Sequence, residues 1–370
     1  MTDTNETIDV AIIGAGVVGL TAACAIAARD YATCVVEREA RPGLGGSSHN
    51  SGVIHAGIYY PPGSAKARLC IEGRERLYNF CRKYNVPHER CGKLIVISNF
   101  DNIDCLEDLA TRGRTNGVDD LEVVDRAFIQ NREPHVEAAA AIWSPSSGIV
   151  EAEALIRTLV KWATTQNVAF LPNTKLERGA GSEHVIALRT GRETIHARTV
   201  INAGGLYADD VSASLGGDTF TIFPVRGDYA ELASSAQHLV RGLVYPLPEP
   251  TGHGLGIHAT RTTWGTVTLG PTARYQARKD DYESNRDSLE TFQHAARQFL
   301  PSLKIDQVKP GGSGVRARGA PSDHPFSDFR IGRDSRLPRL IHAAAIDSPG
   351  LTAALAIAER LADLVEETLS

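Results

Sequence analysis

The sequence predicts an α/β protein in which a mostly antiparallel α+β domain is inserted into a Rossmann-like domain. Three observations predict this fold. A glycine-rich turn links an apolar strand to a helix near the N-terminus, strand and helix patterns return late in the chain, and an alternating, turn-rich texture separates them. We expect a discontinuous first domain and an inserted second domain, with bounds 1–85, 145–215 and 325–370 for the first and 86–144 and 216–324 for the second.

Composition excludes several classes of protein. The 370 residues are 42% hydrophobic and carry a net charge of −5, without a Lys/Arg run, so we expect no nucleic-acid partner. No apolar stretch reaches the roughly 18 residues that a transmembrane segment needs. The six cysteines form no C-x-x-C pair, which argues against a disulfide scaffold or a zinc site. We therefore expect no metal and a reducing, cytoplasmic location.

The first forty residues have the pattern of a βαβ unit that binds a dinucleotide. Ile8–Ile13 reads as a buried strand, Leu20–Ala28 as a helix and Thr33–Val36 as a second strand that ends on an acidic residue. The turn between the first strand and the helix completes the motif G-x-G-x-x-G with Gly14, Gly16 and Gly19. The motif alone does not separate FAD from NAD.

Each part of this motif has its own physical task. Gly14 permits the tight turn, Gly16 lets backbone N–H groups approach a pyrophosphate, and Gly19 lets the helix pack closely on the strand. The helix start offers unpaired N–H donors and a positive dipole end to the phosphates. Glu37 is placed to accept hydrogen bonds from both ribose hydroxyls and would repel a 2′-phosphate. A glycine-rich turn without any ligand is the alternative.

The rest of the chain alternates between helical and strand patterns. We expect helices at Lys66–Tyr84, Leu106–Gly117, Glu153–Gln166, Tyr282–Leu300 and from Ser348 onward. We expect strands at Gly92–Ser98, Val168–Leu171, His196–Gly205 and Pro338–Asp347. Between Phe220 and Pro271 the alternation with Pro and Gly turns predicts an antiparallel sheet.

Several motifs together resemble one enzyme family. The stretch "SSHNSGVIHAGIYYPPGSAKARLC", which starts at Ser47, is the most specific, and "GKLIV", "SPSSGIV", "NAGG", "YPLP", "GLGIH" and "DSPGLTAALAIAE" accompany it. They resemble the FAD-dependent L-2-hydroxyglutarate dehydrogenases and oxidases of the D-amino-acid oxidase superfamily. The resemblance runs nearly end to end, and it implies a D-amino-acid oxidase-like fold with FAD rather than NAD as cofactor.

The resemblance also implies which residues hold FAD. The ADP half is expected at the glycine turn and the end of the second strand, the flavin along the serine-rich segment, and further contacts at "NAGG" and at the last helix. These residues are Gly14, Gly16, Gly19, Glu37, Arg38, Ser47, Ser48, His49, Asn50, Ser51, Ala203, Gly204, Gly350, Leu351 and Thr352.

The last helix has a physical reason to approach the flavin. Reduction places negative charge near N1 and C2=O of the ring system, and a helix start near Pro349 would aim N–H groups and a positive dipole end at that charge. A proline at this position suits a helix start. A plain surface helix with an N-terminal proline is the alternative.

The implied reaction is oxidation of a 2-hydroxy acid to a 2-oxo acid by hydride transfer to flavin N5, with L-2-hydroxyglutarate as the default substrate. It needs a cation for the carboxylate and a base for the hydroxyl proton. Arg316 is our preferred carboxylate ligand, and Arg226 is a candidate for a distal carboxylate. His55 and His258 are the two candidate bases. Candidate wall or hydrogen-bonding residues of the substrate pocket are Tyr59, Tyr60 and Tyr245.

Some motifs depart from the family pattern. "GGSGVRARG" lacks the usual Tyr and Pro, and "PVRGDY" has Arg226 where the family commonly has Lys. These departures lie in the inserted domain, which shapes the substrate pocket, so an amine or amino-acid oxidase stays open as the alternative. A non-catalytic flavoprotein is a third reading. The residues leave the electron acceptor open between oxygen and a quinone, and they leave the oligomeric state open.

Overall fold

The glycine-rich N-terminal stretch forms the predicted βαβ unit. The computed structural model describes residues 7–248 and 255–370, and it begins with β1 (Thr7–Ile13), α1 (Val17–Ala27) and β2 (Thr33–Val36). The two strands pair in parallel, with Val10 opposite Thr33. Residues 10–13 of β1 and all four residues of β2 are buried, which fits apolar runs that are covered on both faces.

The βαβ unit is the centre of an eight-stranded sheet. Its main order is β10-β11-β12-β1-β2-β9, and β20 pairs with the end of β12 and with β19. The pairs of β1 with β12, of β2 with β9 and of β12 with β20 are parallel. The further strands are β9 (Ala169–Leu171), β10 (Leu176–Gly181), β11 (Ile186–Thr190), β12 (Thr194–Asn202), β19 (Arg330–Arg333) and β20 (Leu340–Ala344).

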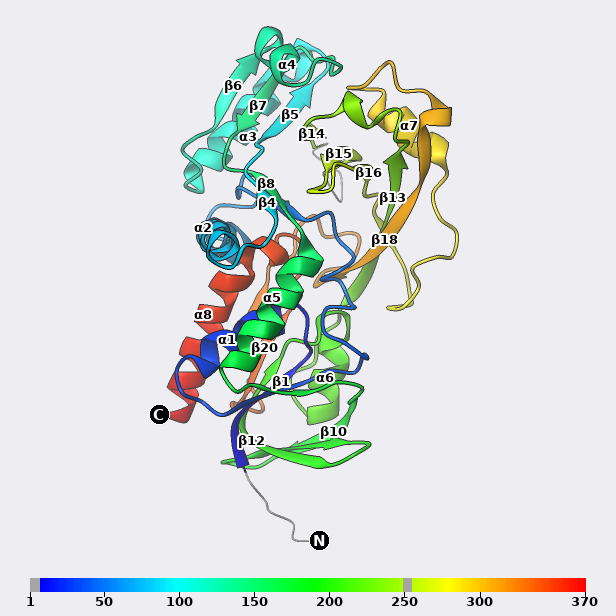
Figure 1. The fold of residues 1–370 in the computed structure, drawn as a ribbon. Helices are drawn as coiled ribbons and strands as arrows, with labels where there is room; N and C mark the ends of the chain where they lie inside the picture. Colours follow the sequence, from blue (N-terminus) through cyan, green and yellow to red (C-terminus); the bar gives the residue numbers. More distant parts are fainter. Residues whose placement is uncertain (1–6, 249–254) are drawn as a thin grey trace.

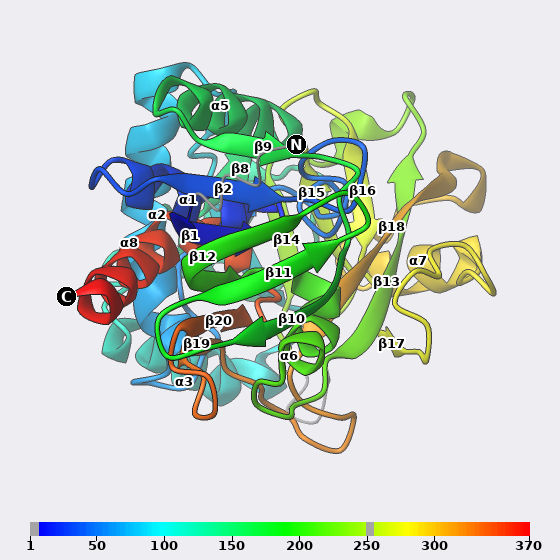
Figure 2. The same cartoon turned by 90° about the horizontal axis from the view of Figure 1, so that it is seen from below.

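This sheet is covered by helices on one side and by its own β10–β11 hairpin and one short helix on the other. On one side α1 packs with α2 (Ala65–Tyr84), α5 (Ala152–Thr165) and α8 (Gly350–Leu369) in one apolar core, as Figure 1 shows. On the other side the β10–β11 hairpin and α6 (Ala208–Leu215) enclose a second core with Val200 and Leu340 (Figure 2). This arrangement leaves the carboxyl ends of β1 and β12 open, where doubly wound sheets bind their ligands.

The inserted region forms a nine-stranded sheet. Its order is β17-β13-β16-β15-β14-β5-β7-β6, with β18 on the other edge of β13. All of its pairs are antiparallel except that of β14 with β5, so the prediction of a mostly antiparallel sheet is confirmed. The strands are β5 (Lys93–Ile97), β6 (Glu122–Asp125), β7 (Ala140–Ser144), β13 (Phe223–Leu232), β14 (Leu243–Pro246), β15 (His258–Arg261), β16 (Val267–Gly270), β17 (Arg274–Tyr275) and β18 (Val308–Arg318).

Short elements join the two sheets. A three-stranded sheet of β3 (Val53–Ile54), β8 (Gly148–Val150) and β4 (His88–Glu89) lies at the junction. The long antiparallel pair of β13 and β18 runs from the lower part of the molecule to the upper part in Figure 1. The upper part also holds α3 (Ile103–Thr115), α4 (Arg126–Arg132) and α7 (Leu289–Ala296). We propose, with this sheet membership as support, the domain bounds given above.

The predicted helix at Tyr282–Leu300 is wrong in its first part. The helix α7 covers only Leu289–Ala296. The Asp281 carboxylate accepts the backbone N–H groups of Glu283 and Ser284, and Asn285 adopts a left-handed φ of 52°. Such local side-chain to backbone bonds compete with a helix, and they turn the chain instead.

Two further observations concern membrane spans and disulfides. Within residues 7–248 and 255–370, none of the helices has the length and apolar character that crossing a bilayer requires. All six cysteines are free thiols, and Cys24, Cys34, Cys70 and Cys81 are buried.

Gly73 sets the distance between α2 and α8. A Cβ at this position would lie 2.4 Å from the Thr352 carbonyl oxygen and 2.6 Å from the Ala353 Cα. We predict that Gly73→Ala lowers the free energy of unfolding by about 1–3 kcal/mol through overpacking, against a gain of about 1 kcal/mol in helix propensity. Urea unfolding measures the difference. Gly332→Ala is the matched control because open space surrounds that position, and a Gly73→Ala protein at least as stable as wild type contradicts the prediction.

Candidate active site

One continuous cleft of about 1730 Å³ runs from the glycine turn to the inserted sheet. Most of the predicted site residues line it, although they come from both sheets and from the segment between β2 and α2. The lining residues among them are Gly14, Gly16, Glu37, Arg38, Ser47, His49, Asn50, Ser51, His55, Tyr59, Tyr60, Ala203, Gly204, Tyr245, His258, Arg316, Gly350 and Leu351. Gly19, Ser48, Arg226 and Thr352 are not among the lining residues.

The glycine turn brings two backbones into close contact. Gly14 has a φ of 104°, and a Cβ there would lie 2.5 Å from the Ala203 carbonyl oxygen. Gly19 lies behind the turn, where a Cβ would come within 2.0 Å of the Gly14 carbonyl oxygen. Only glycine satisfies both positions, so the turn stays thin enough for a ligand to approach the start of α1.

The carboxylate of Glu37 is held in place at this turn. One oxygen accepts the N–H of Ala15 at 2.7 Å, and the other accepts the N–H of Glu39 at 2.8 Å. A carboxylate oxygen has capacity for more than one hydrogen bond, so acceptor positions remain for a ribose. The neighbouring Arg38 lies with its guanidinium carbon 3.9 Å from the centre of the Tyr207 ring, which closes this end of the cleft.

The serine-rich segment packs against the start of α1. The Ser47 hydroxyl oxygen accepts the N–H of Val17 at 2.8 Å. Asn50 stiffens the segment, since its amide donates to the carbonyls of Gly46 and Ser47. Ser48 bonds within the segment rather than lining the cleft, with its hydroxyl 3.4 Å from the Gly45 carbonyl oxygen. The His49 ring lines the cleft and lies 4.9 Å from the Tyr282 ring.

The start of α8 faces the middle of the cleft. No side chain caps it and no acidic residue lies in its first turn, so its positive dipole end is not neutralised locally. Gly350 and Leu351 line the cleft. Thr352 instead supports the neighbouring segment, because its hydroxyl oxygen accepts the N–H of His55 at 3.0 Å.

These features fit a flavin dinucleotide. The Gly14 contact leaves the turn without side-chain bulk, Glu37 keeps free acceptor capacity, and α8 presents an uncapped start. Phosphates, ribose hydroxyls and a reduced flavin ring require those three kinds of group. In the residues present, we find no obstacle to FAD.

His258 stands on β15 at the other end of the cleft. Its Nδ1 lies 2.9 Å from the carbonyl oxygen of Gly256, which can only accept, so Nδ1 carries the proton. The neutral ring therefore presents an Nε2 lone pair, and Nε2 has no hydrogen-bond partner in the described part of the chain. Burial lowers the pKa of His258 to about 3, with Lys93 and Arg316 acting in the same direction.

His55 lies across from it on the segment after β3. Its Nε2 is 3.2 Å from the Ser348 hydroxyl oxygen, and its buried Nδ1 has no partner among the described residues. Burial lowers the pKa of His55 well below its ordinary value, and the charges of Lys93, His258 and Arg316 lower it further. Both histidines are therefore neutral near pH 7.

Three predicted tyrosines line the same end of the cleft. The Tyr245 ring stacks on the His258 ring at 3.7 Å with 15° between their planes. The Tyr59 hydroxyl is buried and has no partner within the described residues. Burial raises the pKa of Tyr59, Tyr60 and Tyr245, so their hydroxyls stay protonated and can donate.

Arg316 and Arg226 lie on opposite faces of their sheet. Arg316 pairs with Val225, so it shares the cleft face of the β13–β18 pair with Gly227 and Tyr229. Its guanidinium has no ion-pair or hydrogen-bond partner among residues 7–248 and 255–370. It is therefore a cation in the cleft without an anion.

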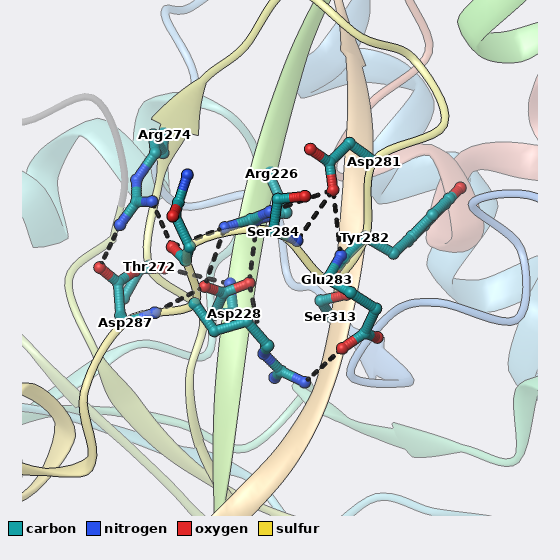
Figure 3. Close-up of polar contacts among 12 residues, drawn as sticks. Arg226, Asp228, Thr272, Arg274, Asp281, Tyr282, Glu283, Ser284, Asp287 and Ser313 are labelled. Carbon is teal, nitrogen blue, oxygen red and sulfur yellow. Dashed lines mark hydrogen bonds and ion pairs between the residues drawn. The ribbon is translucent and has the colours of Figure 1, made fainter.

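The structure does not bring Arg226 into the cleft. Side chains alternate along a strand, so Arg226 and Asp228 project from the face of β13 opposite to Gly227 and Tyr229. Arg226 is 2% exposed, its Nε lies 3.1 Å from Asp228 Oδ1, and its Nη1 lies 3.6 Å from Asp281 Oδ1 (Figure 3). Its charge is already matched, so it is not available for a distal carboxylate.

Sequence reasoning missed two residues at this end of the cleft. Tyr229 lines it from β13, and the buried Lys93 lies beneath Tyr245. The signal for Lys93 was a lysine in an apolar strand, "KLIVI", in which all five residues are buried. A charged residue in such a strand needs an explanation beyond solvation.

A group of potential metal ligands lies away from the cleft. Asp218, Asp334 and His342 come together near β20, and none of them lines the cleft. His342 Nε2 lies 2.8 Å from Asp334 Oδ2, and Asp218 binds Arg330 and Ser335. Their polar groups are thus engaged with one another and with neighbouring side chains.

Comparison with known proteins agrees with this geometry. Residues 9–364 match the model of the FAD dependent oxidoreductase family, DAO. The mitochondrial L-2-hydroxyglutarate dehydrogenase of Nematostella vectensis is 35% identical over 416 residues, covering 98% of this chain and 91% of that protein. The L-2-hydroxyglutarate dehydrogenase of Salmonella houtenae is 31% identical over 399 residues, covering 97% and 93%.

A solved structure agrees as well. The L-alpha-glycerophosphate oxidase of Mycoplasma pneumoniae, with FAD bound, superposes with a TM-score of 0.89 and 26% identity, covering 98% of this chain and 95% of that one. The predicted D-amino-acid oxidase-like fold, the FAD cofactor and the family resemblance are thus confirmed. The chain belongs to the FAD-dependent oxidoreductase family DAO, and within that family to the group of the L-2-hydroxyglutarate dehydrogenases.

Proposed function

We propose that this FAD-dependent oxidoreductase oxidises an L-2-hydroxy acid to the 2-oxo acid, with L-2-hydroxyglutarate as the default substrate. The observation that carries the proposal is the chemistry of the cleft end: an unpaired guanidinium and two neutral histidines face the same space. The names of the full-length relatives support the choice of acid.

Arg316 is proposed to bind the carboxylate of the substrate. Its planar fork suits a bidentate pair, and no acidic side chain of the described chain competes for it. Tyr59 and Tyr229 line the cleft beside it, and the unpartnered Tyr59 hydroxyl offers a further donor. This arrangement would fix the acid by its carboxylate and leave the hydroxyl-bearing carbon toward the histidines.

The histidine pair is proposed to supply the base. The hydroxyl proton would pass to an imidazole nitrogen as the C–H electron pair leaves Cα and the C=O bond forms. His258 offers an Nε2 lone pair, while Ser348 orients His55. A bound carboxylate places negative charge beside both rings, and this raises their pKa values toward the range that suits a base.

FAD supplies the two-electron acceptor for the Cα hydride. The ADP half is proposed to lie at Gly14, Gly16 and Glu37, and the flavin along Ser47–Ser51 and the start of α8. Ala203 and Gly204 close the turn from the other side, with the N–H of Ala203 bonded to the Ile13 carbonyl. Oxygen or a quinone would reoxidise the flavin. Six free thiols support a reducing, cytoplasm-like compartment.

The proposed reaction has a direct test. We expect L-2-hydroxyglutarate, added to the purified yellow protein without oxygen, to bleach the flavin absorbance and to yield one 2-oxo acid for each flavin. The D-enantiomer, L-lactate and a panel of amino acids are run in parallel. Bleaching by amino acids with release of ammonia, and none by hydroxy acids, would replace the proposal with amino-acid oxidation.

The role of Arg316 predicts a binding defect. In Arg316→Ala we expect the flavin to remain bound and kcat/KM for the acid to fall on the order of 100-fold, because a charged hydrogen-bond pair is lost. Arg316→Lys should keep the charge but lose the fork geometry. We expect its kcat/KM to lie between the values of wild type and Arg316→Ala. Arg192→Ala, in the exposed turn after β11, is the control. Wild-type kcat/KM in Arg316→Ala would remove the assigned role.

The lowered histidine pKa values predict the pH dependence. Because the folded pKa of His258 is about 3 rather than 6.5, kcat/KM should stay level as the pH falls from 8 through 6.5, where a free imidazole would protonate. We expect His55→Gln and His258→Gln to keep FAD, and the variant that lacks the base to reduce its flavin at least about 100-fold more slowly. Wild-type rates in both variants, measured by stopped-flow, would exclude the pair as the base.

A further inference from the structure

The lysine that sequence reasoning overlooked stands next to the histidine pair. Lys93 opens β5, is 1% exposed, and has no hydrogen-bond partner for Nζ among the described residues. Its Nζ lies 4.2 Å from the centre of the Tyr245 ring and 5.4 Å from the centre of the Tyr59 ring. Burying a cation without an anion is costly, so its place needs an account.

The strand register puts Lys93, Tyr245 and His258 on one face of the sheet. β14 lies between β5 and β15, and Leu243 pairs with Lys93 on one side and with Thr260 on the other. Tyr245 and His258 each lie two residues from that row. Since side chains alternate, all three project from the face that borders the cleft.

The three side chains therefore form a stack across three strands. The imidazole of His258, from β15, covers one face of the Tyr245 ring at 3.7 Å. The ammonium of Lys93 comes from β5, on the opposite side of β14, and lies 4.2 Å from the centre of the same ring. An ammonium over a buried phenol ring is held by the ring quadrupole, and of the three side chains His258 and Tyr245 line the cleft while Lys93 does not.

We propose that Lys93 is a positioning residue that, together with burial, holds the His55–His258 pair neutral and ready to accept a proton, from behind Tyr245 and without touching the substrate. This inference rests on the proposed function, because it needs the pair to be the base. Lys93 is absent from the cleft lining, so it is not assigned a direct contact with the acid.

The charges around the pair are consistent with this role. The groups that act on the histidines are Lys93 from β5 and Arg316 from β18, with Tyr59, Tyr229 and Tyr245 as neutral neighbours. No carboxylate of the described chain contributes to either histidine. Cys70 and Cys91 are the thiols that face Lys93.

Lys93 carries its positive charge at the lower pH values, where a histidine would be protonated most readily. Burial lowers the pKa of Lys93 to about 7, against the smaller opposing effects of Cys70 and Cys91. Below pH 7 the lysine is charged, and its charge adds to the burial that already lowers the pKa values of both imidazoles. Above pH 7 it loses its charge, where the histidines are neutral in any case.

Histidine titration in the FAD-loaded protein tests the proposal without using turnover. Protein labelled with ¹⁵N in histidine reports tautomer and protonation by NMR, and His55→Gln and His258→Gln assign the two signals. We expect both rings to stay neutral in wild type well below the pH at which a free imidazole protonates, with His258 protonated on Nδ1. In Lys93→Met the pKa values of the pair should rise by on the order of one pH unit.

Matched variants separate charge from structure. Lys93→Arg keeps the cation and should titrate like wild type, and Lys309→Met removes an exposed lysine of β18 and should change nothing. If Lys93→Met does not retain FAD, Lys93→Gln takes its place with the same expectation. The pH at which the rate of flavin reduction falls on the acid side should shift in the same direction as the histidine pKa values measured by NMR.

These measurements distinguish failure of the Lys93 proposal from failure of the proposed reaction. Unchanged histidine titration and an unchanged pH dependence of flavin reduction in a flavin-loaded Lys93→Met protein would overturn the role of Lys93, whatever the substrate proves to be. A shifted titration in a protein that no hydroxy acid reduces would uphold the electrostatic role and reject the proposed reaction instead.

Discussion

The cleft depends on one electrostatic constraint. Positive charge is concentrated at its inner end, and no acidic side chain of the described residues pairs with it. Arg316 has no anionic partner there, Lys93 is buried without one, and both act on His55 and His258. Other buried charges are paired, as with Lys66 and Asp347 in the cleft wall or with Arg226 and Asp228 on the opposite face of β13. This contrast supports our proposal that Arg316 binds the substrate carboxylate.

The same constraint supports our proposal that the two histidines act in the site rather than only as core residues. A neutral imidazole with a free lone pair is the form that accepts a proton, and two nearby cations stabilise that form. Binding of an anionic acid would remove part of that bias at the moment when a base is needed. In this proposal, the cations hold the histidines neutral in the free enzyme, and the negative charge of the bound ligand offsets those cations.

The proposed cofactor end of the cleft depends on close backbone contacts rather than on charge. Gly14 meets the Ala203 carbonyl, and Gly73 lets α8 lie against α2, so the start of α8 reaches the cleft. Thr352 then ties α8 to the segment that carries His55. The proposed cofactor and substrate ends of the cleft are therefore linked by two hydrogen bonds of the Thr352 hydroxyl, one from the N–H of His55 and one to the carbonyl of Val53.

The sequence by itself determined the βαβ unit, the family and most of the cleft lining, because glycine spacing and the segment from Ser47 act locally and leave a readable pattern. It did not determine which arginine faces the cleft: Arg226 and Arg316 look alike in sequence, and strand pairing sends them to opposite faces. It also did not reveal Lys93, since its partners Tyr245 and His258 are about 150 residues away and meet it only through the order of β5, β14 and β15. Pairing between distant strands decides such contacts, and no local pattern encodes it.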